Sequence, residues 1–173
     1  MIIRVLGLAV LLGLLAGCVK LPKDVEPVTG FDAERYLGTW YEIARLDHSF
    51  ERGLSRVTAD YSLREDGGIR VLNRGFSAEK SEWQEAEGKA YFVESEDVGY
   101  LKVSFFGPFY GAYGIFGLDQ EDYQYAWVSG PNTGYLWLLA REPQVSDSVR
   151  QAFVQRASEL GFDTEELIWV EHP

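Results

Sequence analysis

The stretch Trp40–Leu46, WYEIARL, decides the fold, because it is the first of a series of short, aromatic-rich runs. Turn residues separate these runs about every 8–12 residues, which is typical of β-meanders and barrels. The ten Tyr, ten Phe and five Trp of the chain favour strands over helices. The predicted strands are Trp40–Leu46, Arg56–Arg64, Ile69–Phe76, Trp83–Glu94, Tyr100–Phe106, Ala112–Leu118, Tyr123–Ser129 and Tyr135–Arg141.

The period of the pattern changes after the last of these strands. Apolar residues recur at three- and four-residue steps through Ser146–Gly161, which predicts a helix, and Leu167–Val170 predicts a short final strand. The sequence therefore predicts an all-β fold: an eight-stranded antiparallel up-and-down β-barrel, with one C-terminal α-helix packed on the outside and a short final strand. A closed barrel of eight strands can hold one small ligand.

The first residues have the organisation of an export signal. Arg4 precedes Val5–Ala16, an uninterrupted run of apolar residues and Gly. This run is shorter than the roughly 20 residues of a membrane-spanning helix and fits a signal peptide. Leu15–Cys18 (LAGC) resembles the lipobox of bacterial lipoproteins. That resemblance implies cleavage before Cys18 and acyl chains on this cysteine, which would anchor the protein to a membrane.

The chain accordingly divides into three predicted parts. Residues 1–17 are the cleaved lipoprotein signal peptide, residues 18–30 the lipidated N-terminus and a tether, and residues 31–173 the barrel domain. In enteric-type lipoproteins an Asp after the lipidated cysteine directs retention in the inner membrane. Val19 stands there instead, so the resemblance implies the cell outer membrane, with the barrel facing the periplasm.

Charge and cysteine content exclude several classes of partner and chemistry. The formal net charge is −11, and it becomes −12 when Arg4 is removed with the signal. Nucleic acids and bare anionic lipid surfaces would be repelled. Cys18 is the only cysteine, so a mature domain lipidated there has no thiol for a disulfide, a metal or nucleophilic catalysis. We expect no cofactor, no metal site and no catalytic residues.

Two motifs, one in the first and one in the eighth predicted strand, resemble those of the lipocalin family. Gly38-Thr39-Trp40 matches the family's G-x-W element, and Leu139–Arg141 matches its third motif, which carries an Arg. The second motif is only partly present, in Glu121–Tyr123. The resemblance implies that Gly38, Trp40 and Arg141 form the closed end of the barrel, with Arg141 packed across the indole ring.

The similarity is greatest to the bacterial outer-membrane lipoprotein lipocalins. It covers residues 31–172 and is strongest in Trp40–Gly53, Leu101–Tyr110 and Tyr135–Pro143. This subgroup implies a membrane-anchored protein that binds a fatty acid or a lysophospholipid in its barrel. The implied role is storage or transport of lipids in maintenance of the cell envelope.

Alternation of side chains along strands indicates which residues face the interior. If Trp40 points inward, Glu42 and Ala44 do as well. Arg74 could pair with an anionic head group, or it could be a solvated surface residue. Together with the family's habit, this pattern predicts six ligand-binding residues: Ala44, Arg74, Tyr113, Val128, Tyr135 and Trp137.

Two features leave alternatives open. The aromatic run Phe105–Tyr110 is either core or an exposed patch that touches lipid or a second subunit, as in a homodimer. His48 follows Asp47 and is either structural or part of an enzyme. The alternatives to a lipid carrier are therefore an anchored structural or interaction domain without lipid cargo and a lipid-modifying enzyme.

Overall fold

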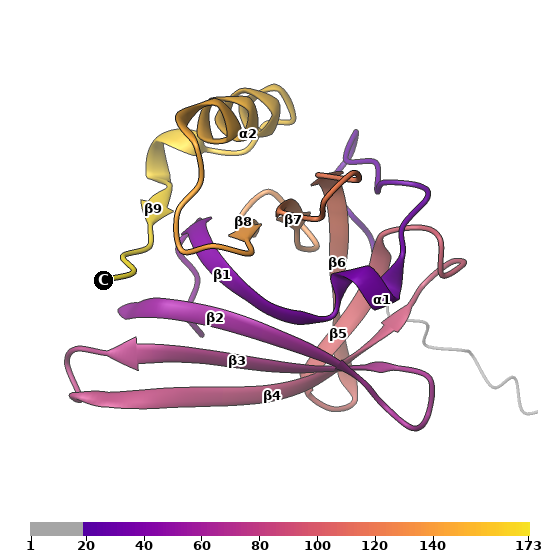
Figure 1. The fold of residues 1–173 in the computed structure, drawn as a ribbon, viewed down its shortest axis with the longest axis horizontal. Helices are drawn as coiled ribbons and strands as arrows, with labels where there is room; N and C mark the ends of the chain where they lie inside the picture. Colours follow the sequence, from indigo (N-terminus) through magenta and orange to yellow (C-terminus); the bar gives the residue numbers. More distant parts are fainter. Residues whose placement is uncertain (1–18) are drawn as a thin grey trace, which may run out of the picture.

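The computed structural model describes residues 19–173, in which the strands curve around one interior (Figure 1). Residues 1–18, with the predicted signal peptide and Cys18, lie outside the described residues. The elements in chain order are α1 (Ala33–Tyr36), β1 (Gly38–Arg45), β2 (Leu54–Leu63), β3 (Ile69–Ser77), β4 (Glu82–Phe92), β5 (Tyr100–Phe106), β6 (Phe109–Leu118), β7 (Tyr125–Ser129), β8 (Leu136–Ala140), α2 (Asp147–Glu159), η1 (Thr164–Glu166) and β9 (Ile168–Trp169).

The strands form one closed antiparallel barrel. Each strand from β2 to β8 pairs with the next, and β1 closes the circle by pairing with both β2 and β8. β9 pairs with Ala44 and Arg45, the end of β1 that β2 leaves uncovered. The predicted eight-stranded barrel with its final short strand is confirmed. β6 begins earlier than predicted, at Phe109, because this residue pairs with Phe106 across the tight turn.

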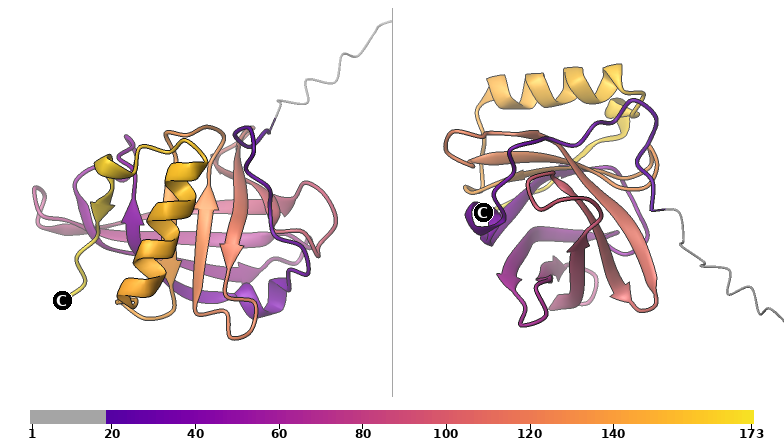
Figure 2. Two further views of the ribbon diagram at one scale, coloured as in Figure 1. Left: turned by 90° about the horizontal axis from the view of Figure 1, so that it is seen from above. Right: turned by 90° about the vertical axis from the view of Figure 1, so that its right-hand side faces the viewer.

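The predicted C-terminal helix lies against the outside of the barrel (Figure 2). The Ser146 hydroxyl caps its first turn by accepting a hydrogen bond from the Val149 amide. Gly161 follows the helix with a φ of +85°, a left-handed conformation that glycine adopts at little cost. Phe153 and Ala157 are fully buried, and they pack with residues of β1 and β8 in a cluster outside the barrel.

The residues that precede α1 are fastened along the barrel wall. Val28 accepts a hydrogen bond from the Gly99 amide and donates one to the Ile115 carbonyl, both at 2.8 Å. Val25 is buried in the outer cluster, and the Tyr100 hydroxyl donates to the Val19 carbonyl. Residues 18–30 are predicted to be a tether, but residues 19–30 lie on the barrel (Figure 2). The chain between the predicted anchor at Cys18 and the barrel therefore has much less free length than the predicted tether implies.

Candidate ligand-binding site

The barrel contains two adjoining hollows. An inner chamber of about 90 Å³ lies within the barrel, and an outer chamber of about 310 Å³ lies at its mouth. The two chambers adjoin, because five residues line both: Phe50, Glu51, Val57, Asn73 and Phe105. The remaining lining of the inner chamber is predominantly apolar. Concave, mainly apolar sites with a few polar groups are typical of small-molecule binding.

The opposite end of the barrel is closed by an arginine on an indole ring. The guanidinium carbon of Arg141 lies 3.9 Å from the centroid of the fully buried Trp40 ring. Its Nη1 and Nη2 donate to the carbonyls of Thr39 and Arg35 at 3.0 and 2.8 Å. Gly38 has a φ of +93° and passes beneath the guanidinium, where an added Cβ would be 3.5 Å from Nη1. This contact combines cation–π attraction with satisfied backbone acceptors.

Three tyrosine hydroxyls meet inside the inner chamber. Tyr113 Oη lies 2.8 Å from both Tyr36 Oη and Tyr61 Oη. Burial raises the pKa of all three phenols, so they remain protonated. Three hydroxyls carry three protons, and the two hydrogen bonds use two of them. One O–H therefore has no acceptor in this cluster.

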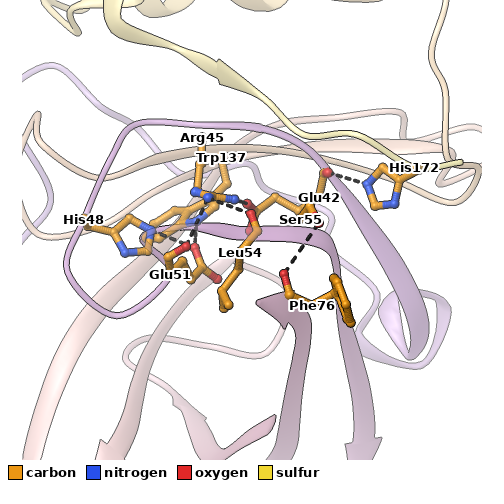
Figure 3. A network of polar contacts seen from close by, with 9 residues as sticks. All are labelled: Glu42, Arg45, His48, Glu51, Leu54, Ser55, Phe76, Trp137 and His172. Atoms are coloured by element: carbon orange, nitrogen blue, oxygen red, sulfur yellow. Dashed lines mark hydrogen bonds and ion pairs between the residues drawn. The ribbon is translucent and has the colours of Figure 1, made fainter. Parts of the chain in front are cut away.

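A buried polar network occupies the half of the barrel nearer the mouth (Figure 3). Glu42 and Arg45 of β1 form an ion pair with an N–O distance of 2.7 Å. In the loop between β1 and β2, His48 Nε2 lies 2.7 Å from Glu51 Oε2. Trp137 of β8 donates to the same oxygen at 3.1 Å, and Arg45 donates to the backbone carbonyl of Glu51 at 3.0 Å. The network thus fixes the loop over the barrel mouth.

The two glutamates of this network have opposite pKa shifts. Burial, followed by the charge of Glu51, raises the pKa of Glu42 well above its ordinary value despite the ion pair with Arg45. Burial is the largest single effect on Glu51 and acts to raise its pKa, but the contacts with His48, Trp137 and Arg45 together outweigh it and the pKa is lowered. One carboxyl is therefore biased to hold a proton and its neighbour to carry a charge.

Comparison with known proteins identifies this architecture. The family model for the lipocalin-like domain matches residues 31–172. The chain is a lipocalin. It is 63% identical to the outer membrane lipoprotein Blc of Vibrio cholerae, covering 91% of this chain and 92% of that protein. It is 55% identical to the outer membrane lipoprotein Blc of Escherichia coli, covering 88% and 85%. Among solved structures, insecticyanin of Manduca sexta is similar in fold, with a TM-score of 0.70, 20% identity and coverage of 89% and 87%.

Three of the six ligand-binding residues predicted for this lipocalin line its inner chamber: Tyr113, Val128 and Trp137. Tyr135 lies at the mouth, stacked on the Phe50 ring with centroids 6.3 Å apart. Arg74 lines the outer chamber, where it lies over the Trp83 ring and 3.4 Å from Glu85. The arginine is therefore already paired within the protein.

The prediction that Ala44 faces the barrel interior is wrong. The residue was expected to face the interior with Trp40 and Glu42, but it lies in the outer cluster that packs against α2. The pairing of β1 with β8 has an irregularity between Glu42 and Ala44, which shifts the alternation beyond that point by one residue. Ala44 thus belongs to the packing between barrel and helix.

The carboxylates and two of the tyrosines of the lipocalin cavity were not among the predicted site residues. Alternation from Trp40 places Glu42 inward, so a charged residue at an inward position was the signal available. Glu51 belongs to a loop, and its place over the cavity depends on contacts with Arg45 and Trp137 that no local pattern encodes.

The aromatic run between β5 and β6 was predicted to be either core or an exposed patch, and its residues include both. Phe105 lines both chambers. Phe106 and Phe109 also line the outer chamber, yet they are 79% and 78% exposed at its rim, and Phe50 is 54% exposed beside them. The mouth of this lipocalin is therefore surrounded by exposed phenylalanines.

Within residues 19–173, no cluster of His, Cys, Asp and Glu has the arrangement of a metal site. No helix in that range has the length and apolar character needed to cross a bilayer.

Proposed function

We propose that this lipocalin holds a single-chain lipid, a fatty acid or a lysophospholipid, in its barrel for storage or transport in the cell envelope. The observation that carries the proposal is the apolar, two-chamber cavity that opens at the barrel mouth. Burial of an acyl chain there would supply about 0.8 kcal/mol for each methylene group. The few polar groups of the cavity would orient the head group.

The proposed site of action is the periplasmic face of the outer membrane, with Cys18 as the lipid anchor. The names of the Vibrio cholerae and Escherichia coli relatives, which are outer membrane lipoproteins, support this location. The fastening of residues 19–30 to the barrel would keep the cavity close to the membrane that supplies or receives the lipid.

Ligand extraction tests the proposal. A chain that begins at Val19 would be purified and examined by native mass spectrometry, then titrated with a fluorescent fatty acid. We expect a co-purified fatty acid or lysolipid that the probe displaces. Absence of a displaceable ligand in both assays would contradict the proposal.

A cavity-filling variant tests where the ligand lies. Ala112 lines the inner chamber, so Ala112→Phe should weaken probe binding at least about tenfold. Gly111→Phe is the matched control, because a Cβ at the preceding residue meets no atom within 4 Å. Equal binding by both variants would place the ligand elsewhere.

The exposed rim favours a second candidate, an anchored interaction domain that carries no lipid. Phe106 and Phe109 could form a contact with a second copy of the chain. Sedimentation velocity of the delipidated protein tests this alternative. It is favoured if a stable dimer forms while no lipid is bound.

We propose that the protein binds lipid without chemically changing it, and that the buried His48 is not a catalytic residue. Asp47 lies 2.7 Å from Arg52 Nη2, and His48 faces Glu51 and the Phe50 ring instead. This arrangement supports a structural role for His48. Hydrolysis of a lysophospholipid by the wild type that is lost in His48→Ala would overturn it.

A further inference from the structure

The polar groups that line the inner chamber are acidic or neutral. They are the carboxyl groups of Glu42 and Glu51, the hydroxyls of three tyrosines and the amide of Asn73. Among the described residues that line this chamber, none is Lys, Arg or His. A ligand head group that reaches the chamber therefore touches the two carboxyl groups and no basic residue of the lining.

The basic partners of the two carboxyl groups, Arg45 and His48, are not among the residues that line the inner chamber. Arg45 contacts Glu42 through Oε1, and both His48 and Trp137 contact Glu51 through Oε2. Each carboxyl group thus directs one oxygen to its protein partners, and the residue itself still lines the cavity. The exposed fractions are only 3% for Glu42 and 6% for Glu51, so water screens this pair weakly.

The two carboxyl groups also act on each other. Burial raises the pKa of Glu42, and the negative charge of Glu51 raises it further. A ligand carboxylate would bring a third acidic group to this point. A ligand ammonium would supply a positive charge and N–H donors to the carboxyl oxygens that their protein partners leave free.

We propose that Glu42 and Glu51 form a receptor for an ammonium group, so that the cavity selects single-chain lipids with a primary amine head over those with a carboxylate. This inference rests on the proposed lipid-binding function and specifies the head group. Arg74 does not oppose it, because that arginine lies outside the inner chamber and is paired with Glu85.

Matched amphiphiles provide the test. Dodecylammonium and laurate have chains of the same length and opposite head-group charge. We expect the protein lacking residues 1–18 to bind dodecylammonium about tenfold more tightly than laurate, as one charge-assisted hydrogen bond would allow. The same order is expected for lysophosphatidylethanolamine over lysophosphatidylglycerol with the same acyl chain. The lysolipid pair distinguishes a phospholipid source of the ammonium from a simple amine.

Glu51→Gln tests the residue itself, since the amide has nearly the same shape without the charge. The variant should remove the preference for dodecylammonium while binding of dodecanol, a neutral probe, stays within about twofold of the wild type. Glu87→Gln is the control, because it removes one negative charge from an exposed ion pair with Arg70. It should leave the preference intact.

The outcomes separate this inference from the proposed function. Equal binding of laurate and dodecylammonium by the wild type overturns the ammonium receptor and leaves lipid binding in place. Loss of the preference in both Glu51→Gln and Glu87→Gln would assign it to net charge and also overturn the receptor. Failure of every amphiphile, dodecanol included, to bind the wild type overturns the proposed function together with the inference.

Discussion

The two ends of the barrel handle buried polar groups in different ways. At the closed end, Arg141 covers Trp40 and donates to two backbone carbonyls, so its donors meet acceptors of the neutral main chain. At the mouth, Arg45 and Glu51 place charges of both signs, beside the carboxyl group of Glu42, in a region that is almost fully buried. Buried ion pairs carry a large desolvation cost, which their mutual attraction only partly offsets.

This difference supports the proposal that the closed end serves stability and the mouth serves recognition of a ligand. The closed-end contacts would be equally useful in a barrel without ligand. The charges at the mouth are poorly suited to stabilising the fold, since apolar residues of similar size are often as good or better. Their value is explained if they meet a ligand that enters from the outer chamber.

The largest expected effect is at the closed end. Trp40→Ala should lower the free energy of unfolding by about 3–5 kcal/mol, because it removes a fully buried indole and the surface on which Arg141 packs. Urea denaturation followed by circular dichroism measures the change. Trp83→Ala at the mouth is the control; that side chain is 42% exposed and should cost less than about 1 kcal/mol. Similar losses of unfolding free energy in the two variants would contradict the idea that the closed end contributes more to stability than the mouth.

The second largest effect on stability is expected in the tyrosine cluster inside the cavity. Tyr113→Phe removes the hydroxyl that joins Tyr36 and Tyr61 and leaves two buried hydroxyls without this partner. We expect a loss of about 1–3 kcal/mol in the free energy of unfolding, measured in urea. Tyr110→Phe, on the same strand and outside the cluster, should be close to neutral. An unchanged stability in Tyr113→Phe would mean that the three hydroxyls do not depend on one another.

Glu42 should make the free energy of unfolding depend on pH, and its raised pKa determines the sign of that dependence. Its pKa in the folded protein is raised above the ordinary value of 4.5, so the folded state holds this proton more tightly than the unfolded chain does. As pH rises above 4.5, the unfolded chain loses the proton first. The free energy of unfolding therefore falls, by at most about 1.4 kcal/mol per pH unit for one proton, until the pH passes the folded pKa.

Urea denaturation at a series of pH values measures this slope. Glu42→Gln cannot titrate, so the difference between wild type and variant isolates the contribution of this residue. Glu51 contributes with the opposite sign, because its lowered pKa gives stability that is lost only as pH falls below its ordinary value of 4.5. A wild type whose stability follows that of Glu42→Gln above pH 4.5 would show that Glu42 is ionised in the folded state.

The sequence predicted the closed end better than the mouth, and the reason is physical. Trp40 and Arg141 lie in motifs that resemble the family's, and alternation along a regular strand identifies Val128 and Trp137 as inward residues. The same alternation failed at Ala44, where an irregularity in the β1–β8 pairing shifts the pattern. Such an irregularity depends on how two distant strands pair, and a local pattern does not contain that information.

The mouth depends still more on contacts between distant parts of the chain. Glu51 reaches the cavity because its loop folds back onto Arg45 and onto Trp137 of β8. The apolar run Phe105–Tyr110 predicted equally well a core or a surface, because hydrophobicity alone does not distinguish a residue at a turn from one facing the interior. The tight turn between β5 and β6 decides it by leaving Phe106 and Phe109 on the rim.

The smallest effect on stability is expected at this rim. Phe106→Ser should change the free energy of unfolding by no more than about 0.5 kcal/mol, since the ring is 79% exposed and loses little packing. Its effect should appear in association. If the rim forms a homodimer, the variant should sediment as a monomer at concentrations where the wild type is dimeric. Leu63→Ser is the control, because Leu63 is 58% exposed at the end of β2 that lies away from the mouth. Dimers that persist in Phe106→Ser and dissociate in Leu63→Ser would move the interface from the mouth to the closed end.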